Sequence, residues 1–204
     1  MGCARQRVGG PGVISSPRLV VITGGSGTGK STLARALQAR WLPQQWLHFS
    51  PDTILHALPQ AVVDRANLHN DWSAIDRPLL RRSTYACLEA LLDAGQRVLF
   101  DCVIMTERSA RELVVALRAS EPYLVRLTCA WSELQRRTQA RGDRTLEEVE
   151  HGFKNAVQHL HVDCEVDTSG RNPDEVASAV IAAMSQPSDS SAWAANVARY
   201  AAAP

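Results

Sequence analysis

Short apolar runs alternate with longer amphipathic segments along this chain. Five runs have the length and the β-branched or aromatic content of buried strands: residues 19–22, 46–49, 97–101, 123–129 and 164–167. Other segments carry apolar residues at helical spacing and predict helices: residues 33–41, 53–58, 79–94, 107–119, 132–141, 145–159 and 173–184. Strands that alternate with helices predict one α/β domain, a three-layer α/β/α fold around a parallel sheet of five strands.

The remaining segments are polar or biased in composition. Residues 60–77 are expected to be irregular and are suited to cover a substrate. Residues 1–17 lack the apolar centre of a secretory signal and are expected to form a disordered leader. Residues 185–191 resemble a linker, and the alanine-rich residues up to 204 suit either a helix or a loose tail. The folded domain is therefore expected over residues 18–184.

Composition narrows the possible partners and the compartment. The 204 residues carry a formal charge of +1, and no apolar run reaches the roughly 20 residues of a membrane helix, so neither nucleic acid nor membrane is favoured as a partner. The five cysteines are odd in number and mostly lie in apolar segments, which is typical of reduced thiols in a cytoplasmic protein. No C-x-x-C or H-E-x-x-H pattern supports a zinc site. Nothing in the sequence indicates an oligomeric state.

The glycine-rich turn between the first strand and the first helix is the strongest motif. Residues 24–31, GGSGTGKS, fit the phosphate-binding loop G-x-x-x-x-G-K-[ST], in which backbone N–H groups and the following helix N-terminus surround phosphate oxygens. Lys30 is expected to reach the β- and γ-phosphates and Ser31 to ligate Mg²⁺. A glycine-rich turn with a chance lysine is the alternative, but the flanking strand and helix disfavour it. The predicted nucleotide-binding residues of this loop are Gly24, Gly25, Ser26, Gly27, Thr28, Gly29, Lys30, Ser31 and Thr32.

Two aspartates stand at the carboxyl ends of predicted strands, where open α/β sheets place their ligands. Asp52 follows the second strand and is either a catalytic group that orients an acceptor hydroxyl or the N-cap of the next helix, and one role does not exclude the other. Asp101 ends the third strand in a Walker B pattern, which predicts contact with Mg²⁺ or with the substrate.

Three arginines surround a predicted break between two helices. Arg137 and Arg141 share a helical face and Arg144 follows the break, so these cations could form a small helical lid, over about residues 137–146, that closes on ATP. The alternative is a solvated basic face balanced by the glutamates of residues 147–150. Because the same sequence contains a phosphate-binding loop, we favour the lid over the solvated face as the interpretation of these arginines. The six histidines show no metal-ligand pattern and are expected at the surface or in packing.

The ordered set of motifs resembles the chloramphenicol phosphotransferase family of small P-loop kinases. The matching stretches are residues 22–31, 49–59, 137–144 and 165–168. The resemblance implies an adenylate-kinase-like core that uses ATP with Mg²⁺ and transfers the γ-phosphate to an antibiotic hydroxyl. It also implies that Asp52 is the catalytic base, that Arg137 and Arg141 are the lid arginines, and that Asp167 and Thr168 lie near adenine.

Two segments depart from that family. The third strand ends in Asp101-Cys102 where the family tends to have two acids, and residues 60–82 look different where the acceptor is expected. We therefore expect an ATP-dependent O-phosphotransferase for a hydroxylated small molecule, with chloramphenicol or another antibiotic as leading acceptor. A kinase for a nucleoside, or for a sugar nucleotide as in zeta-type toxins, is an alternative. A nucleotide-dependent binding module with little catalysis is another.

Overall fold

A parallel sheet forms the centre of the molecule. The computed structural model describes residues 17–141, 146–155, 159–186 and 191–201. The sheet has five strands in the order β2-β3-β1-β4-β5, and every neighbouring pair is parallel. The strands are β1 (Leu19–Gly24), β2 (Leu47–Phe49), β3 (Val98–Cys102), β4 (Tyr123–Thr128) and β5 (Cys164–Asp167). The predicted α/β fold with a five-stranded parallel sheet is confirmed.

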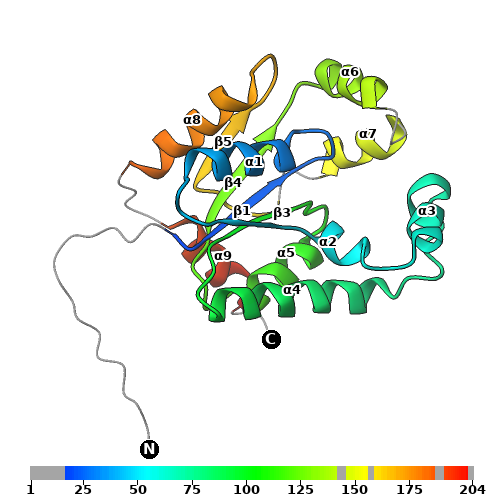
Figure 1. Cartoon of the computed structure of the whole chain (residues 1–204), viewed down its shortest axis with the longest axis horizontal. Coiled ribbons are helices and arrows are strands. Elements are labelled where there is room, and N and C mark those ends of the chain that lie inside the picture. Colours follow the sequence, from blue (N-terminus) through cyan, green and yellow to red (C-terminus); the bar gives the residue numbers. More distant parts are fainter. Residues whose placement is uncertain (1–16, 142–145, 156–158, 187–190, 202–204) are drawn as a thin grey trace, which may run out of the picture.

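Helices cover both faces of this sheet (Figure 1). One face carries α1 (Lys30–Arg40) and α8 (Pro173–Met184), and the other carries α4 (Arg77–Asp93), α5 (Glu107–Ala116) and α9 (Ala192–Ala201). The remaining described helices lie around the carboxyl edge of the sheet: α2 (Pro51–Leu55), α3 (Gln60–His69), α6 (Trp131–Arg141) and α7 (Leu146–Asn155). None of the described helices combines the length and the apolar content needed to cross a lipid bilayer.

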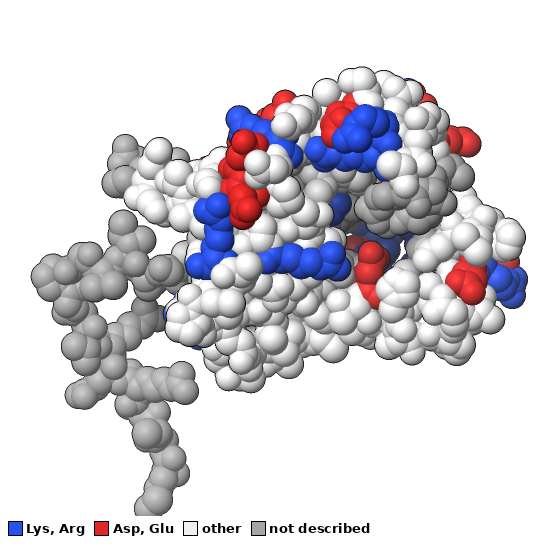
Figure 2. All heavy atoms as spheres, turned by 45° about the horizontal axis from the view of Figure 1, so that its top comes forward, with Lys and Arg blue, Asp and Glu red and all other residues white. Residues whose placement is uncertain are grey.

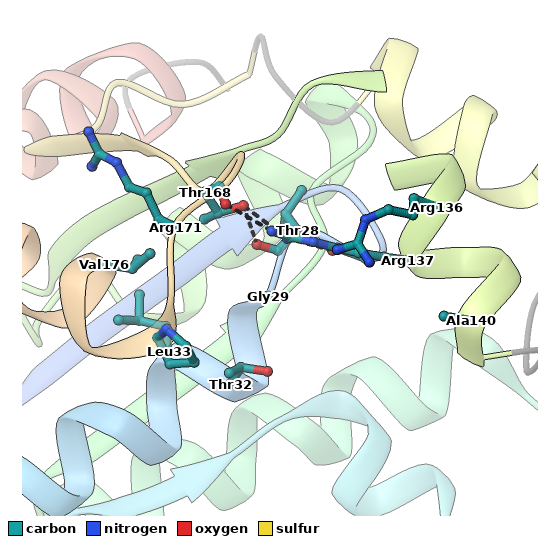
Figure 3. A pocket seen from close by; sticks show the side chains of 12 residues that line it. Thr28, Gly29, Thr32, Leu33, Arg136, Arg137, Ala140, Thr168, Arg171 and Val176 are labelled. Carbon is teal, nitrogen blue, oxygen red and sulfur yellow. Dashed lines mark hydrogen bonds between the residues drawn. The ribbon is translucent and has the colours of Figure 1, made fainter. Parts of the chain in front are cut away.

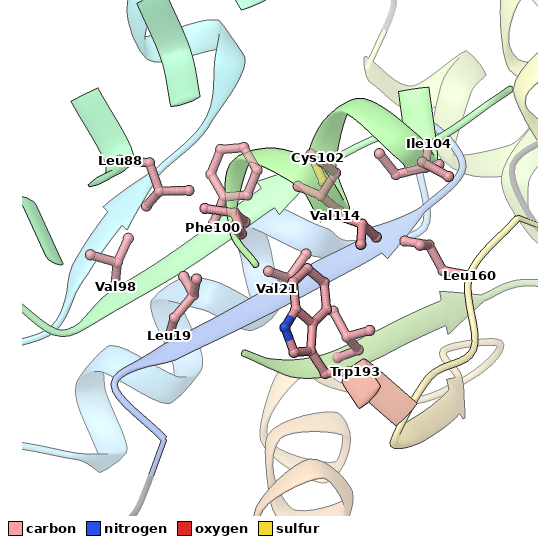
Figure 4. Packing of buried hydrophobic residues seen from close by; sticks show 14 of the residues in the cluster. Leu19, Val21, Leu88, Val98, Phe100, Cys102, Ile104, Val114, Leu160 and Trp193 are labelled. Carbon is pink, nitrogen blue, oxygen red and sulfur yellow. The ribbon is translucent and has the colours of Figure 1, made fainter. Parts of the chain in front are cut away.

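The central strand β1 has apolar side chains on both faces of the sheet, so helices must bury both faces. Its side chains alternate between the two faces, so Leu19 and Val21 pack with α4, α5 and α9 in one hydrophobic cluster (Figure 4). Val20 and Ile22 pack with α1 and α8 in the second cluster. All four side chains are fully buried, as a parallel strand with helices on both sides requires.

The last described helix completes one of these layers. Trp193 and Tyr200 of α9 are buried, and the Tyr200 hydroxyl donates a 2.6 Å hydrogen bond to the His159 backbone oxygen. Asn196 is fully buried and exchanges two hydrogen bonds with the backbone of His161, at 2.8 and 2.9 Å. The described part of the alanine-rich tail is therefore a packed helix, which is one of the two conformations that the sequence allowed.

The expectation of an irregular segment at residues 60–77 is wrong for its first half. Residues Gln60–His69 form α3, which begins after Pro59 and ends at Asn70 in the left-handed conformation. Val63 and Ala66 are buried, and α3 joins a small hydrophobic cluster with Leu55 and Ile75 that stands apart from the sheet. The helix α3 buries only a few apolar side chains in this small cluster. Its sequence therefore lacks the long apolar stripe by which a helix is predicted.

Candidate active site

Because all strands are parallel, the loops that follow them meet at one edge of the sheet. The carboxyl ends of the strands point toward α2, α6 and α7 (Figure 1). Figure 2 shows a hollow in the molecular surface with both basic and acidic side chains at its walls. Contacts at this edge join residues that are far apart in the sequence, from the loop after β1, α1, β2, β3, α6 and the loop after β5.

The loop between β1 and α1 has the backbone that a phosphate-binding loop requires. Gly24, Gly27 and Gly29 have φ values of 147°, 81° and 94°, which glycine adopts without strain. A Cβ atom on Gly24 would lie 2.5 Å from the Leu127 oxygen and 2.9 Å from the Thr28 hydroxyl oxygen. Gly29 is the N-cap of α1 and supplies no capping side chain, so the first N–H groups of α1 are suited to an anion. This cradle fits a nucleotide phosphate.

Lys30 lies inside the loop. Its side chain is buried, and its Nζ donates to the backbone oxygens of Gly24 and Gly25 at 3.1 and 2.9 Å. An ammonium group held here places a positive charge beside the cradle.

The helix α7 lies close to the same loop. A Cβ atom on Gly152 of α7 would lie only 3.6 Å from the Ser26 nitrogen.

Ser31 and Asp101 are brought into direct contact. The Ser31 hydroxyl donates to Asp101 Oδ2 at 2.8 Å, and His48 Nε2 lies 2.7 Å from the same oxygen. Burial raises the pKa of Asp101, but the hydrogen bonds from His48 and Ser31 and the charge of Lys30 outweigh it, so this pKa is lowered. A carboxylate that stays ionised beside a serine hydroxyl fits Mg²⁺, which prefers oxygen ligands.

Within the described residues, no cluster of three or more His, Cys, Asp or Glu side chains could hold a metal ion by itself. A magnesium ion commonly takes one or two protein oxygens and completes its shell with phosphates and water, so Ser31 and Asp101 suit an ion that arrives with a nucleotide. Cys102 does not join them, because it packs in the hydrophobic cluster beneath α5. Burial and the Asp101 charge raise the pKa of its thiol to about 12.

Asp52 is exposed in the first turn of α2. The N-cap of this helix is Ser50, whose backbone N–H is bonded to the Thr53 hydroxyl at 3.2 Å, so the interpretation of Asp52 as the N-cap is wrong. The Asp52 carboxylate makes no hydrogen bond within the described residues. It stands at the carboxyl edge of the sheet, available to a ligand.

Arg137 connects three of the loops. Its Nη2 donates to the Thr168 backbone oxygen at 2.8 Å, and its Nη1 lies 3.1 Å from the Thr168 hydroxyl and 3.5 Å from the Gly27 oxygen. Its Nε donates to Glu133 at 2.8 Å. Hydrogen bonds from Arg136 and from Arg137 lower the pKa of Glu133 to about 2. The Arg137 guanidinium is thereby fixed beside the phosphate-binding loop.

The other two predicted lid arginines are less completely described. Arg141 is the last residue of α6, and only its backbone belongs to the described structure. Arg144 lies outside the described residues. The lid predicted over residues 137–146 therefore includes a described helix on each side, α6 and the beginning of α7.

A cavity of about 400 Å³ opens beside the phosphate-binding loop, between α1, α6 and the start of α8 (Figure 3). Apolar groups of Leu33 and Val176 form part of the wall, and Arg136 and Arg171 add cationic groups. An apolar wall with nearby cations suits the base and phosphates of a nucleotide. The cavity is lined by Gly27, Thr28, Gly29, Thr32, Leu33, Arg136, Arg137, Ala140, Thr168, Arg171, Pro173 and Val176.

The loop after β5 contributes Thr168 to this cavity but not Asp167. The Thr168 hydroxyl donates to the Thr28 backbone oxygen at 3.1 Å, which ties this loop to the phosphate-binding loop. Asp167 instead accepts hydrogen bonds from the hydroxyl and the backbone of Ser169, at 2.7 and 2.9 Å, and these lower its pKa. Its carboxylate shapes the turn that carries Thr168.

The sequence reasoning missed three side chains at this edge: His48, Arg136 and Arg171. His48 carried no signal because its partner, Asp101, is 53 positions away. Arg136 is adjacent to a predicted lid arginine, and Arg171 follows Thr168 closely in the chain, so proximity to predicted residues could have suggested both.

The fold and the loop define a P-loop protein of the kinase type. The model of the chloramphenicol phosphotransferase-like family matches residues 17–185, and the chain therefore belongs to that family, as predicted. No curated protein has a significant sequence match to the chain.

Several solved structures share this fold. A gluconokinase from Sinorhizobium meliloti 1021 is 17% identical, with a TM-score of 0.57 over 83% of this chain and 92% of that chain. A tunicamycin resistance protein from Deinococcus radiodurans is 19% identical, with a TM-score of 0.58 over 84% and 97% of the two chains. The Mycobacterium tuberculosis APS kinase in complex with AMPPNP and APS is also 19% identical, with a TM-score of 0.59 over 83% and 99%. These similarities establish the fold.

Proposed function

We propose that this protein is an ATP-dependent kinase that transfers the γ-phosphoryl group to a hydroxyl of a small molecule. The observation that carries the proposal is the group of contacts at the carboxyl edge: Lys30 held inside a glycine cradle, with Ser31 bonded to an ionised, buried Asp101. Family membership and a kinase-type fold support the same reaction class.

In this proposal the nucleotide occupies the 400 Å³ cavity and the adjoining loop. The backbone N–H groups of residues 24–32 and the Lys30 ammonium bind its phosphates, while Thr168 and its turn, shaped by Asp167, lie along its base. Arg137, Arg141 and Arg144 supply positive charge to the transferring group. Ser31 and Asp101 hold Mg²⁺, which neutralises charge on the phosphate oxygens when bound.

The acceptor hydroxyl is oriented by Asp52. Its oxygen attacks the γ-phosphorus, the bond from that phosphorus to the β,γ-bridging oxygen breaks, and ADP leaves. The hydroxyl proton passes to the Asp52 carboxylate. The Asp52 carboxylate is exposed at the edge where the loops meet and makes no hydrogen bond to any described residue, so it is available for this role.

The leading acceptor is chloramphenicol or another hydroxylated antibiotic. The family description supports this choice, and a tunicamycin resistance protein is among the proteins that share the fold. The segment around α3 departs from the family, so a nucleoside or a sugar nucleotide is the alternative acceptor.

We also propose that the protein works in the cytoplasm. The described cysteines are all free, which suits a reducing compartment.

The test is ATP consumption with Mg²⁺, with and without a panel of hydroxylated antibiotics led by chloramphenicol, with products read by mass. An added phosphoryl group on a panel member supports the reaction and identifies the acceptor. Tight ATP binding without any transfer, to these or to nucleosides and sugar nucleotides, would instead favour a nucleotide-dependent binding module. A sugar-nucleotide kinase of the toxin type would also slow the growth of cells that express it.

A further inference from the structure

His48 makes a buried contact that the proposed reaction has not yet used. It lies on the edge strand β2, next to β3, and its Nε2 is 2.7 Å from Asp101 Oδ2. The side chains are mostly buried, with 21% of His48 and 10% of Asp101 exposed. Since an ionised carboxylate only accepts hydrogen bonds, the proton in this contact belongs to His48 Nε2.

Two donors converge on one carboxylate oxygen. The Ser31 hydroxyl donates to Asp101 Oδ2 at 2.8 Å, so His48 and Ser31 share this acceptor. Within the described residues, Asp101 Oδ1 accepts no hydrogen bond. A serine hydroxyl that donates its proton keeps its lone pairs for another partner. Asp101 Oδ1 and the Ser31 lone pairs are therefore the oxygen groups left for a cation.

We propose that His48 is a positioning residue, which fixes the Asp101 carboxylate through Oδ2 so that Oδ1 and the Ser31 hydroxyl are presented together to the divalent cation of the nucleotide. This inference rests on the proposed kinase function. A carboxylate can rotate about its side-chain bonds, and one donor from α1 alone fixes it less well than two donors from two elements. Partners that orient metal ligands in this way typically change metal affinity by about 10- to 100-fold.

The experiment measures binding of a non-hydrolysable ATP analogue by calorimetry, in Mg²⁺ and in a chelator, so that no turnover is needed. The ratio of the two affinities is the magnesium enhancement. His48→Leu removes the donor, and we expect the enhancement to fall by about tenfold or more while binding in chelator is unchanged. His48→Gln keeps an amide donor at a similar reach and should retain most of the enhancement.

His56→Leu is the matched control, because His56 is exposed just after α2 and its side chain makes no hydrogen bond or ion pair within the described residues. Melting temperatures of all variants separate positioning from unfolding. An unchanged enhancement in His48→Leu overturns the inference, and so does an equal loss of binding in Mg²⁺ and in chelator, which marks a merely structural role. If the unaltered protein binds no nucleotide, the proposed function itself fails, which is a distinct outcome.

Discussion

Arg137 on α6 donates a 2.8 Å hydrogen bond to the backbone oxygen of Thr168, which lies 31 positions later in the chain. The same guanidinium reaches the Thr168 hydroxyl at 3.1 Å and the Gly27 oxygen at 3.5 Å. One side chain therefore connects α6, the turn after β5 and the phosphate-binding loop. All three segments contribute residues to the lining of the 400 Å³ cavity, which we propose as the nucleotide site.

The first prediction concerns this contact. Arg137→Ala should weaken binding of an ATP analogue by about tenfold to a hundredfold, since charge-assisted hydrogen bonds contribute about 1.5–3 kcal/mol. Arg137→Lys should recover little of the loss, because lysine lacks the planar fork. Calorimetry measures both. Arg118→Ala, at an exposed position, is the control; a lysine variant with normal affinity would contradict the argument.

Asp52→Asn should reduce phosphoryl transfer by about a hundredfold or more, because the amide cannot accept the acceptor proton. Binding of the ATP analogue should stay within about twofold, since Asp52 is placed on the acceptor and not on the nucleotide. Single-turnover transfer and calorimetry give the two numbers. Asp93→Asn, also exposed, should change neither. Normal turnover in Asp52→Asn would remove Asp52 from the reaction.

Asp101 should make stability depend on pH in acid. Its pKa in the folded protein lies below the ordinary 3.8, so its stabilising contribution is complete above that value and is lost as the pH falls through the lower, folded pKa. Asp101→Asn should be less stable at neutral pH and should lose less stability on acidification. Urea unfolding from neutral pH to below 3.8 measures this. Parallel pH curves for the two proteins would contradict the assignment.

Gly24→Ala should disrupt the phosphate-binding loop, because the added Cβ would meet the Leu127 oxygen at 2.5 Å. A contact this short forces the backbone of β1 or β4 to move, so we expect a lower melting temperature and loss of nucleotide binding. Gly25→Ala is a suitable control for folding, since its nearest contact would be an ordinary 3.5 Å. Equal melting temperatures for the two variants would show that the loop can relax.

Asn196→Ala should destabilise the whole domain by about 2 kcal/mol, because it leaves buried backbone groups of His161 without partners. For a domain of this size the melting temperature should fall by several degrees, or about 2–4 °C per kcal/mol. Ser178→Ala, on exposed α8 surface, is the comparison. An unchanged melting temperature would mean that α9 does not fold cooperatively with the sheet.

Local signals account for much of what the sequence predicted. The strand β5 and the helix α8 begin and end where the sequence placed them, because the alternation of apolar and acidic residues in β5 and a proline at the start of α8 are local features. The glycine-rich loop was equally predictable, since its backbone shape is encoded in consecutive residues. The helix α3 was not predicted, because the few residues that it buries do not form a clear apolar stripe in the sequence.

The amino-acid sequence by itself determined the family, the alternation of strands and helices, and the loop that suits a phosphate. Only the tertiary structure decided which side chains meet. Asp101 and Cys102 are neighbours in sequence, yet the strand directs one to Ser31 and His48 and the other into the hydrophobic core. The reason is physical: pairing β3 between β1 and β2 brings together residues far apart in the chain, and no local pattern records such a contact.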